Sequence, residues 1–143
     1  MCNDVSHPKS IVILAAGDFP RSNSVLHLLD EADMIICCDS AAVALLDSGR
    51  RPDLIVGDMD SLQAELRERY ADRIRKIDEQ EDNDLTKAVH AAMEYSPQCI
   101  HILGATGRRE DHTLGNISLL ARYAAEAGGR CEIDLVRDRK SVV

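Results

Sequence analysis

The chain has 143 residues, 45% of them hydrophobic and only 3% aromatic, which predicts one domain with a core of aliphatic side chains. Its net charge of −8, from 25 acidic and 17 basic side chains, argues against binding to nucleic acid, because such proteins neutralise phosphates with basic residues. The sequence contains no run of 18 apolar residues, and its N-terminus does not resemble a signal peptide. We therefore expect a cytoplasmic protein without a membrane partner.

The cysteines of the chain do not form a disulfide framework. Their number is five, which is odd, and none belongs to a C-x-x-C pair. Two of them, Cys37 and Cys38, lie inside an apolar run, where free cysteine behaves as a small apolar residue. We expect reduced, structural thiols.

Short apolar runs alternate with amphipathic stretches along the chain. Strands are expected at 10–17, 34–38, 54–56, 73–77, 99–104 and 131–136, and helices at 22–32, 40–49, 62–71, 84–95 and 112–129. This alternation predicts right-handed crossovers between parallel strands. The expected fold is a doubly wound, mostly parallel α/β sheet of about six strands, with helices on both faces. Ligands of such folds bind beyond the carboxyl ends of the strands.

The stretch PDLIVGDMDSL, residues 52–62, places carboxylates before and after a short strand. Asp58 and Asp60 are two residues apart, so in extended backbone their side chains point the same way, and Gly57 allows a sharp exit from the strand. Converging carboxylates suit Mg²⁺, which takes oxygen ligands and shares them with phosphates. The alternative is a turn followed by a helix cap, in which Asp60 or Ser61 caps the next helix.

The stretch EDNDLTKA, residues 81–88, opens a predicted helix. Asp82 or Asn83 could cap this helix, and acidic residues in the first turn are favourable there. In the functional interpretation, Asp84 adds a third carboxylate to the same strand-end crevice. Lys87 could reach a phosphate, although a solvated lysine is the default alternative.

The stretch GATGRREDHTLGN, residues 104–116, connects a buried strand to a helix. Gly104 and Gly107 bracket a tight loop of the kind that brings backbone N–H groups close to an anion. Arg108 and Arg109 supply positive charge in an acidic chain, and Asp111 could cap the helix or pair with an arginine. The loop is neither a Walker A motif nor a G-x-G-x-x-G fingerprint.

Two further clusters follow strands. The loop AAGDFPRSNS, residues 15–24, could bring Gly17 close to a nucleotide. Asp39, in CDSAA, occupies a place where doubly wound folds often set an acid against ribose hydroxyls, though it could equally cap a helix. The histidines show no metal-ligand spacing; His101 is expected to be a core or edge residue, and only His112 falls near the proposed site.

Taken in order, CDSAA, PDLIVGDMDS, NDLTKA and GATGRREDH resemble the motifs of thiamine pyrophosphokinases, over residues 11 to about 136. The resemblance implies transfer of pyrophosphate from ATP to thiamine, giving thiamine diphosphate and AMP. It implies Mg²⁺ on Asp58, Asp60 and Asp84, with Arg109 contacting phosphate and Asp111 following it. It also implies a homodimer in the full-length protein and a C-terminal, thiamine-binding β-sandwich, which this chain of one α/β domain (1–143) is expected to lack.

The expected nucleotide- and substrate-binding residues complete this prediction. They are Gly17, Asp39, Ser40, Gly57, Ser61, Asn83, Thr86, Lys87, Gly104, Thr106, Gly107, Arg108, His112 and Asn116. The chain departs from the family pattern where C-A-D-G-G-A-N would stand, since Ser40, Ala41 and Ala42 follow Asp39. Two other functions are left open: a nucleotide-binding domain that is inactive without its second domain, and an aspartyl-phosphate phosphatase with Asp58 as nucleophile.

Overall fold

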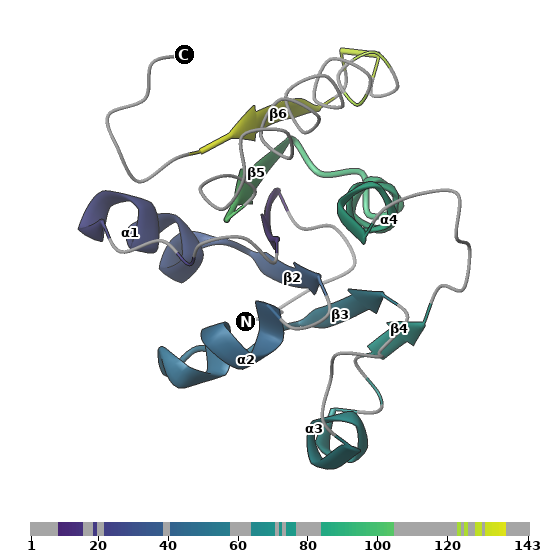
Figure 1. Cartoon of the computed structure of the whole chain (residues 1–143). Coiled ribbons are helices and arrows are strands. Elements are labelled where there is room, and N and C mark those ends of the chain that lie inside the picture. The colour runs from purple at the N-terminus through teal and green to yellow at the C-terminus, as the bar shows by residue number, and fades with distance from the viewer. Residues whose placement is uncertain are drawn as a thin grey trace, which may run out of the picture.

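The apolar runs of the sequence form one parallel sheet in the computed structural model of the chain (Figure 1). The structure describes residues 9–15, 19, 22–38, 41–57, 64–70, 72, 74–76, 84–104, 123, 125, 128–129 and 131–136. Its strands are β1 (Ser10–Leu14), β2 (Met34–Cys38), β3 (Leu54–Gly57), β4 (Ile74–Lys76), β5 (Cys99–Leu103) and β6 (Glu132–Leu135). Their order across the sheet is β4-β3-β2-β1-β5-β6, and every neighbouring pair is parallel.

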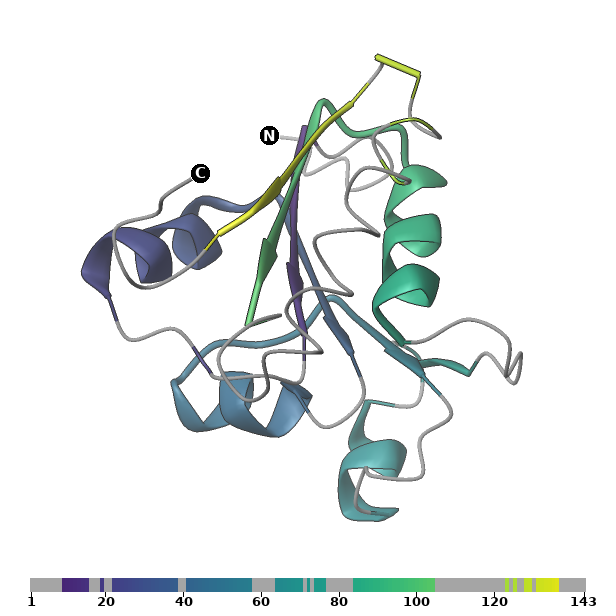
Figure 2. The same ribbon diagram turned by 45° about the horizontal axis from the view of Figure 1, so that its top comes forward.

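Helices cover both faces of this sheet, as predicted. They are α1 (Asn23–Glu31), α2 (Ala41–Asp47), α3 (Ala64–Arg69) and α4 (Asp84–Met93). Figure 2 shows α1 and α2 on one side of the strands and α4 on the other. No helix within these described ranges is long and apolar enough to cross a membrane. The predicted α/β class is therefore confirmed.

The central strand β1 divides its side chains between two cores. Ile11 and Ile13 pack with α4, whereas Val12 and Leu14 pack with α1 and α2. All five residues of β2 are buried as well. Strands covered on both faces read as continuous apolar runs, which explains why the sequence shows no alternation here.

Two aspartates organise the amino ends of the strands. The carboxylate of Asp33, which precedes β2, accepts hydrogen bonds from the backbone N–H groups of Lys9 (2.8 Å) and Ser10 (3.2 Å). The carboxylate of Asp53, which precedes β3, accepts one from Ile35 N–H at 2.8 Å, while its own N–H donates to the Ile35 carbonyl. Each aspartate thus provides a hydrogen-bond acceptor for backbone N–H groups at the start of the neighbouring strand.

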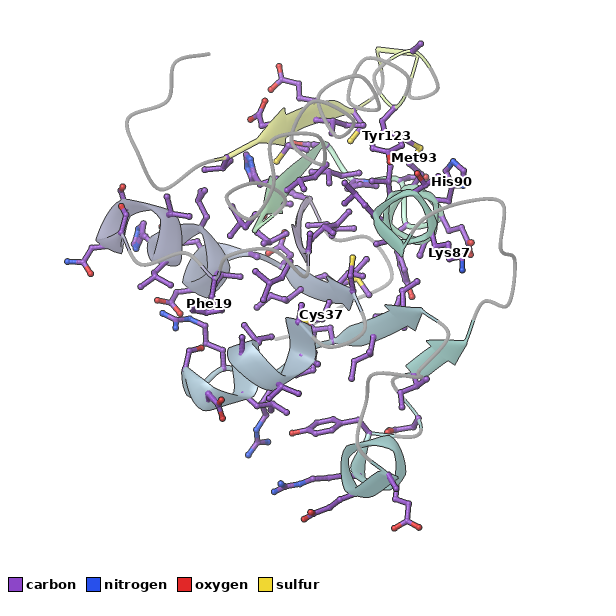
Figure 3. All side chains as sticks on the ribbon, viewed as in Figure 1. Phe19, Cys37, Lys87, His90, Met93 and Tyr123 are labelled. Carbon is purple, nitrogen blue, oxygen red and sulfur yellow. The ribbon has the colours of Figure 1, made fainter. Side chains whose placement is uncertain are left out.

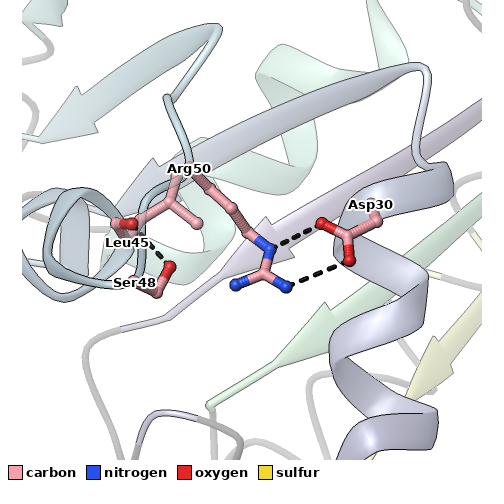
Figure 4. Close-up of polar contacts among 4 residues, drawn as sticks. All are labelled: Asp30, Leu45, Ser48 and Arg50. Atoms are coloured by element: carbon pink, nitrogen blue, oxygen red, sulfur yellow. Dashed lines mark hydrogen bonds and ion pairs between the residues drawn. The ribbon is translucent and has the colours of Figure 1, made fainter.

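The C-terminus of α2 ends in a left-handed turn that faces α1. Gly49, at φ +90°, allows Arg50 N–H to donate to the Leu45 carbonyl and Gly49 N–H to the Leu46 carbonyl. This pattern is the Schellman motif, and it confirms the predicted helix end at Gly49. Arg50 then makes a two-pronged ion pair with Asp30 of α1, with Nε–Oδ1 and Nη2–Oδ2 distances of 2.7 and 3.0 Å (Figure 4).

The strand order reverses between β1 and β5. From β1 the chain builds outward through β2, β3 and β4 on one side, then returns to β5 and β6 on the other. At the carboxyl ends of β1 and β5, Ala15 N–H donates a hydrogen bond to the Leu103 carbonyl at 2.8 Å. In doubly wound sheets such a reversal opens a ligand-binding crevice.

Candidate functional site

The carboxyl ends of four central strands lie along one edge of the sheet. The register pairs Leu14 with both Cys37 and Leu103, and Cys38 with Val56. The predicted motifs continue from this edge, because Asp39 follows β2 directly, Asp58 follows β3 and Gly104 follows β5. The sheet therefore brings the starting points of three separate motifs to one edge.

Two glycines at this edge adopt backbone conformations that other residues avoid. Gly57, the last residue of β3, has φ +147°, and Gly104, directly after β5, has φ +70°. A side chain at either position would strain the backbone. Both positions thus use the conformational freedom of glycine, which the sequence indicated at Gly57.

The first turn of α4 lies at the same edge. Since α4 follows β4 and precedes β5 in a parallel sheet, the helix begins on the carboxyl side and runs back along the strands (Figure 2). It packs on β1, β2 and β3. The turn contains Asp84, whose backbone is described while its side chain is not. The helix therefore brings the described part of this motif, residues 84–88, to the edge from which the other motifs continue.

The side chain of Lys87 is buried, with only 6% of its surface exposed. The default expectation of a solvated lysine is therefore wrong. Lysines are rarely buried this deeply without a partner of opposite charge or a hydrogen-bonding one. Figure 3 shows its side chain on α4, the helix that also carries the labelled side chains of His90 and Met93, with Tyr123 beside it.

Thr86, the neighbour of Lys87, is also buried, at 1% exposure. Its Oγ1 lies 2.6 Å from the hydroxyl oxygen of Tyr123, which is fully buried. The Thr86 hydroxyl thus has a protein partner, and a direct contact with a nucleotide stays a prediction. Sequence reasoning missed Tyr123, although it lies seven residues after Asn116 and so on the same face of the predicted helix.

Most of the predicted site residues fall outside the described part of the chain. Of the proposed metal ligands and catalytic residues, the side chains of Asp58, Asp60, Asp84, Arg109 and Asp111 are all outside it. The same holds for Gly17, Asp39, Ser40, Ser61, Asn83, Thr106, Gly107, Arg108, His112 and Asn116. Among the residues that are described, no three His, Cys, Asp or Glu side chains form a group that could hold a metal ion.

A second group of side chains, of the types used in nucleophilic catalysis, lies near the amino end of β5. Cys99 Sγ is 3.7 Å from His101 Nε2, and His101 Nδ1 is 3.3 Å from Asp134 Oδ2. Burial raises the pKa of the Cys99 thiol, and the carboxylates of Asp134, Glu132 and Asp33 add to this. A reactive cysteine needs the opposite shift. The arrangement therefore resembles a nucleophilic triad only in the order of its side chains, which is cysteine, histidine and aspartate.

Comparison with known proteins decides the family. The sequence model of the protein family "Thiamin pyrophosphokinase, catalytic domain" matches residues 25–131. The chain belongs to this family. A thiamine pyrophosphokinase from Bacillus subtilis is 36% identical over 116 residues, covering 78% of this chain and 54% of the relative. Thiamine pyrophosphokinase 1 from rice is 32% identical over 147 residues, covering 85% of this chain and 54% of the relative.

Solved structures of family members share the fold. The crystal structure of thiamin pyrophosphokinase from Geobacillus thermodenitrificans matches with a TM-score of 0.70 at 31% identity, covering 89% of this chain and 59% of that one. The Bacillus subtilis enzyme matches with a TM-score of 0.67 at 31% identity, covering 90% and 60%. The chain thus spans little more than half the length of these relatives.

Proposed function

We propose that this chain is the ATP-binding, catalytic domain of a thiamine pyrophosphokinase, which transfers pyrophosphate from ATP to thiamine. The observation that carries the proposal is the family match over residues 25–131, an interval that contains all four acidic and glycine-rich motifs. The strand ends support it, because the residues preceding Asp39 and Asp58 lie on one edge of the sheet beside the first turn of α4.

The acidic motifs would hold Mg²⁺ through Asp58, Asp60 and Asp84. Three carboxylates supply the hard oxygen donors that this ion prefers, so the donor set fits. When bound, Mg²⁺ offsets the negative charge of the ATP phosphates. A chain with a net charge of −8 needs such an offset to bind a polyanion.

The remaining residues would carry out the transfer. The hydroxyl oxygen of thiamine attacks the β-phosphorus of ATP, forming one P–O bond while the bond to the bridging α–β oxygen breaks, and AMP leaves. Arg109 stabilises charge around the transferred group, and Asp111 accepts the hydroxyl proton. We expect the full-length protein to act as a homodimer, with thiamine bound partly by residues outside this chain.

Calorimetric titration of ATP, with and without Mg²⁺, tests the proposal. We expect binding that requires Mg²⁺ and weakens at least tenfold in Asp58→Asn, because the substitution removes a charged ligand. Binding without turnover agrees with a domain that needs its second half. Magnesium-independent binding, or no binding, would contradict the proposal. Phosphate trapped covalently on Asp58 would instead indicate the aspartyl-phosphate phosphatase alternative.

A further inference from the structure

A buried pair of hydroxyl groups joins two segments that are far apart in the sequence. Thr86 Oγ1 and the Tyr123 hydroxyl oxygen lie 2.6 Å apart, although the residues are 37 positions apart. Both side chains are almost completely inaccessible, at 1% and 0% exposure. Figure 3 shows Tyr123 beside α4. A hydrogen bond that is this short and shielded from solvent fixes the distance between the two groups that form it.

The pair joins one predicted motif to a residue that follows another in the sequence. Thr86 is in the first turn of α4, two residues after Asp84 and next to Lys87. Tyr123 is a helical residue that follows Arg109 by 14 positions in the sequence. The phosphate-binding residues expected on these segments must be in register for one ligand to contact both.

The surroundings of the pair are apolar and tightly packed. Tyr123 belongs to the same buried cluster as Leu85, Ala88 and Val89 of α4 and Ile100 and Ile102 of β5. In such surroundings a hydroxyl that loses its partner cannot be satisfied by bulk water. The pair therefore favours one placement of the first turn of α4 over small rotations and shifts of that turn.

We propose that Thr86 and Tyr123 are positioning residues, which hold the first turn of α4, and with it the backbone of Asp84, in the placement that Mg–ATP binding requires. The proposal rests on the proposed function and assigns the Thr86 hydroxyl an indirect role in nucleotide binding. It also gives a role to Tyr123, which none of the sequence motifs includes. Substitution of residues that orient metal ligands typically lowers the affinity for the metal by about tenfold to a hundredfold.

Two substitutions at residue 86 separate hydrogen bonding from packing. Thr86→Val keeps the volume and removes the hydroxyl, whereas Thr86→Ser keeps the hydroxyl and removes a methyl group. For positioning, we expect Thr86→Val to weaken Mg–ATP binding about tenfold and Thr86→Ser to stay within about twofold of the parent chain. If only packing matters, Thr86→Ser will bind no better than Thr86→Val, and the proposal is overturned.

Tyr123→Phe supplies a second test that removes a single oxygen atom, so the fold survives even if Thr86→Val does not fold. We expect about tenfold weaker Mg–ATP binding and a higher Mg²⁺ concentration for half-maximal binding. The double variant should bind no more weakly than either single variant, because the hydroxyls act as a unit. Additive losses would show that the two residues act independently, which contradicts the proposal.

A matched control separates positioning from loss of stability. Asp53→Ala removes a hydrogen bond at the opposite edge of the sheet and should lower the melting temperature without altering the Kd for Mg–ATP. If Asp53→Ala weakens binding as much as Tyr123→Phe, the pair has a purely structural role. Failure of the parent chain to bind Mg–ATP refutes the proposed function itself. Binding by the parent that Tyr123→Phe leaves unchanged refutes only the positioning role.

Discussion

Asp53 and Asp58 stand in one short acidic stretch, but β3 separates them. Asp53 precedes the strand and pairs with the backbone of Ile35 at the amino end of the sheet. Asp58 follows the strand at its carboxyl end, where ligands bind in this class of fold. The acidic stretch therefore contains one aspartate with a structural role, Asp53, and one with a proposed metal-binding role, Asp58, and substitutions should separate the two.

We predict that Asp53→Ala lowers the free energy of unfolding by about 1–2 kcal/mol, because the partly buried N–H of Ile35 loses its charged acceptor. Urea titration followed by circular dichroism measures this loss. Asp53→Asn is the matched control, since its amide oxygen can still accept the bond and should preserve much of the stability. Equal losses for Ala and Asn would show that charge, rather than the hydrogen bond, matters at this position.

At the scale of elements, the end of α2 is attached to α1 by one ion pair. The left-handed Gly49 turns the backbone so that Arg50 faces Asp30 (Figure 4). The hydrogen bond from Arg50 lowers the pKa of the Asp30 carboxyl from its ordinary value of 3.8. A carboxyl whose pKa is lower in the folded state stabilises the fold above its unfolded pKa and loses this effect as the pH falls through its folded pKa.

We therefore predict that the parent chain loses more stability than Asp30→Asn when the pH falls from 7 to below 3.8, so that their melting temperatures converge in acid. Thermal melts across this range measure the convergence. The difference at pH 7 should be small and should shrink with added salt, because Asp30 is exposed. Arg50→Lys should also reduce the effect of Asp30→Asn on the melting temperature at pH 7, since an ammonium group cannot form the two-pronged contact. A difference that persists in acid would contradict the prediction.

At the scale of the whole molecule, the sequence predicted the described elements well because each has a local cause, whereas the predicted helix 112–129 falls mostly outside the described residues. Apolar runs gave the strands, and Gly49 marked the end of α2 through its left-handed turn. The role of Asp53 and the burial of Lys87 could not be predicted, because each depends on how the fold packs around the residue. The Thr86–Tyr123 contact crosses 37 residues and has no local signature. Local patterns thus specify elements, whereas partners across the fold require the tertiary structure.

The acidity of the whole chain leads to the last prediction. In the proposed function, the carboxylates of Asp58, Asp60 and Asp84 converge at one edge of the sheet and therefore repel each other, in a molecule whose net charge is −8. We predict that Mg²⁺ alone raises the melting temperature more than KCl of equal ionic strength does, because a bound ion stabilises the folded state by mass action, by about 2.7 kcal/mol at 100 times its Kd.

Asp58→Asn should change this behaviour in two opposite ways. It should raise the melting temperature without Mg²⁺, because it removes one of the repelling charges, and it should remove the extra stabilisation by Mg²⁺, because it removes a ligand. Glu65→Gln, an exposed substitution in the first turn of α3, changes the net charge equally and should have neither effect. Equal stabilisation by MgCl₂ and KCl in the parent chain would mean that the aspartates do not converge on an ion, and that the acidic motifs serve as turns and helix caps.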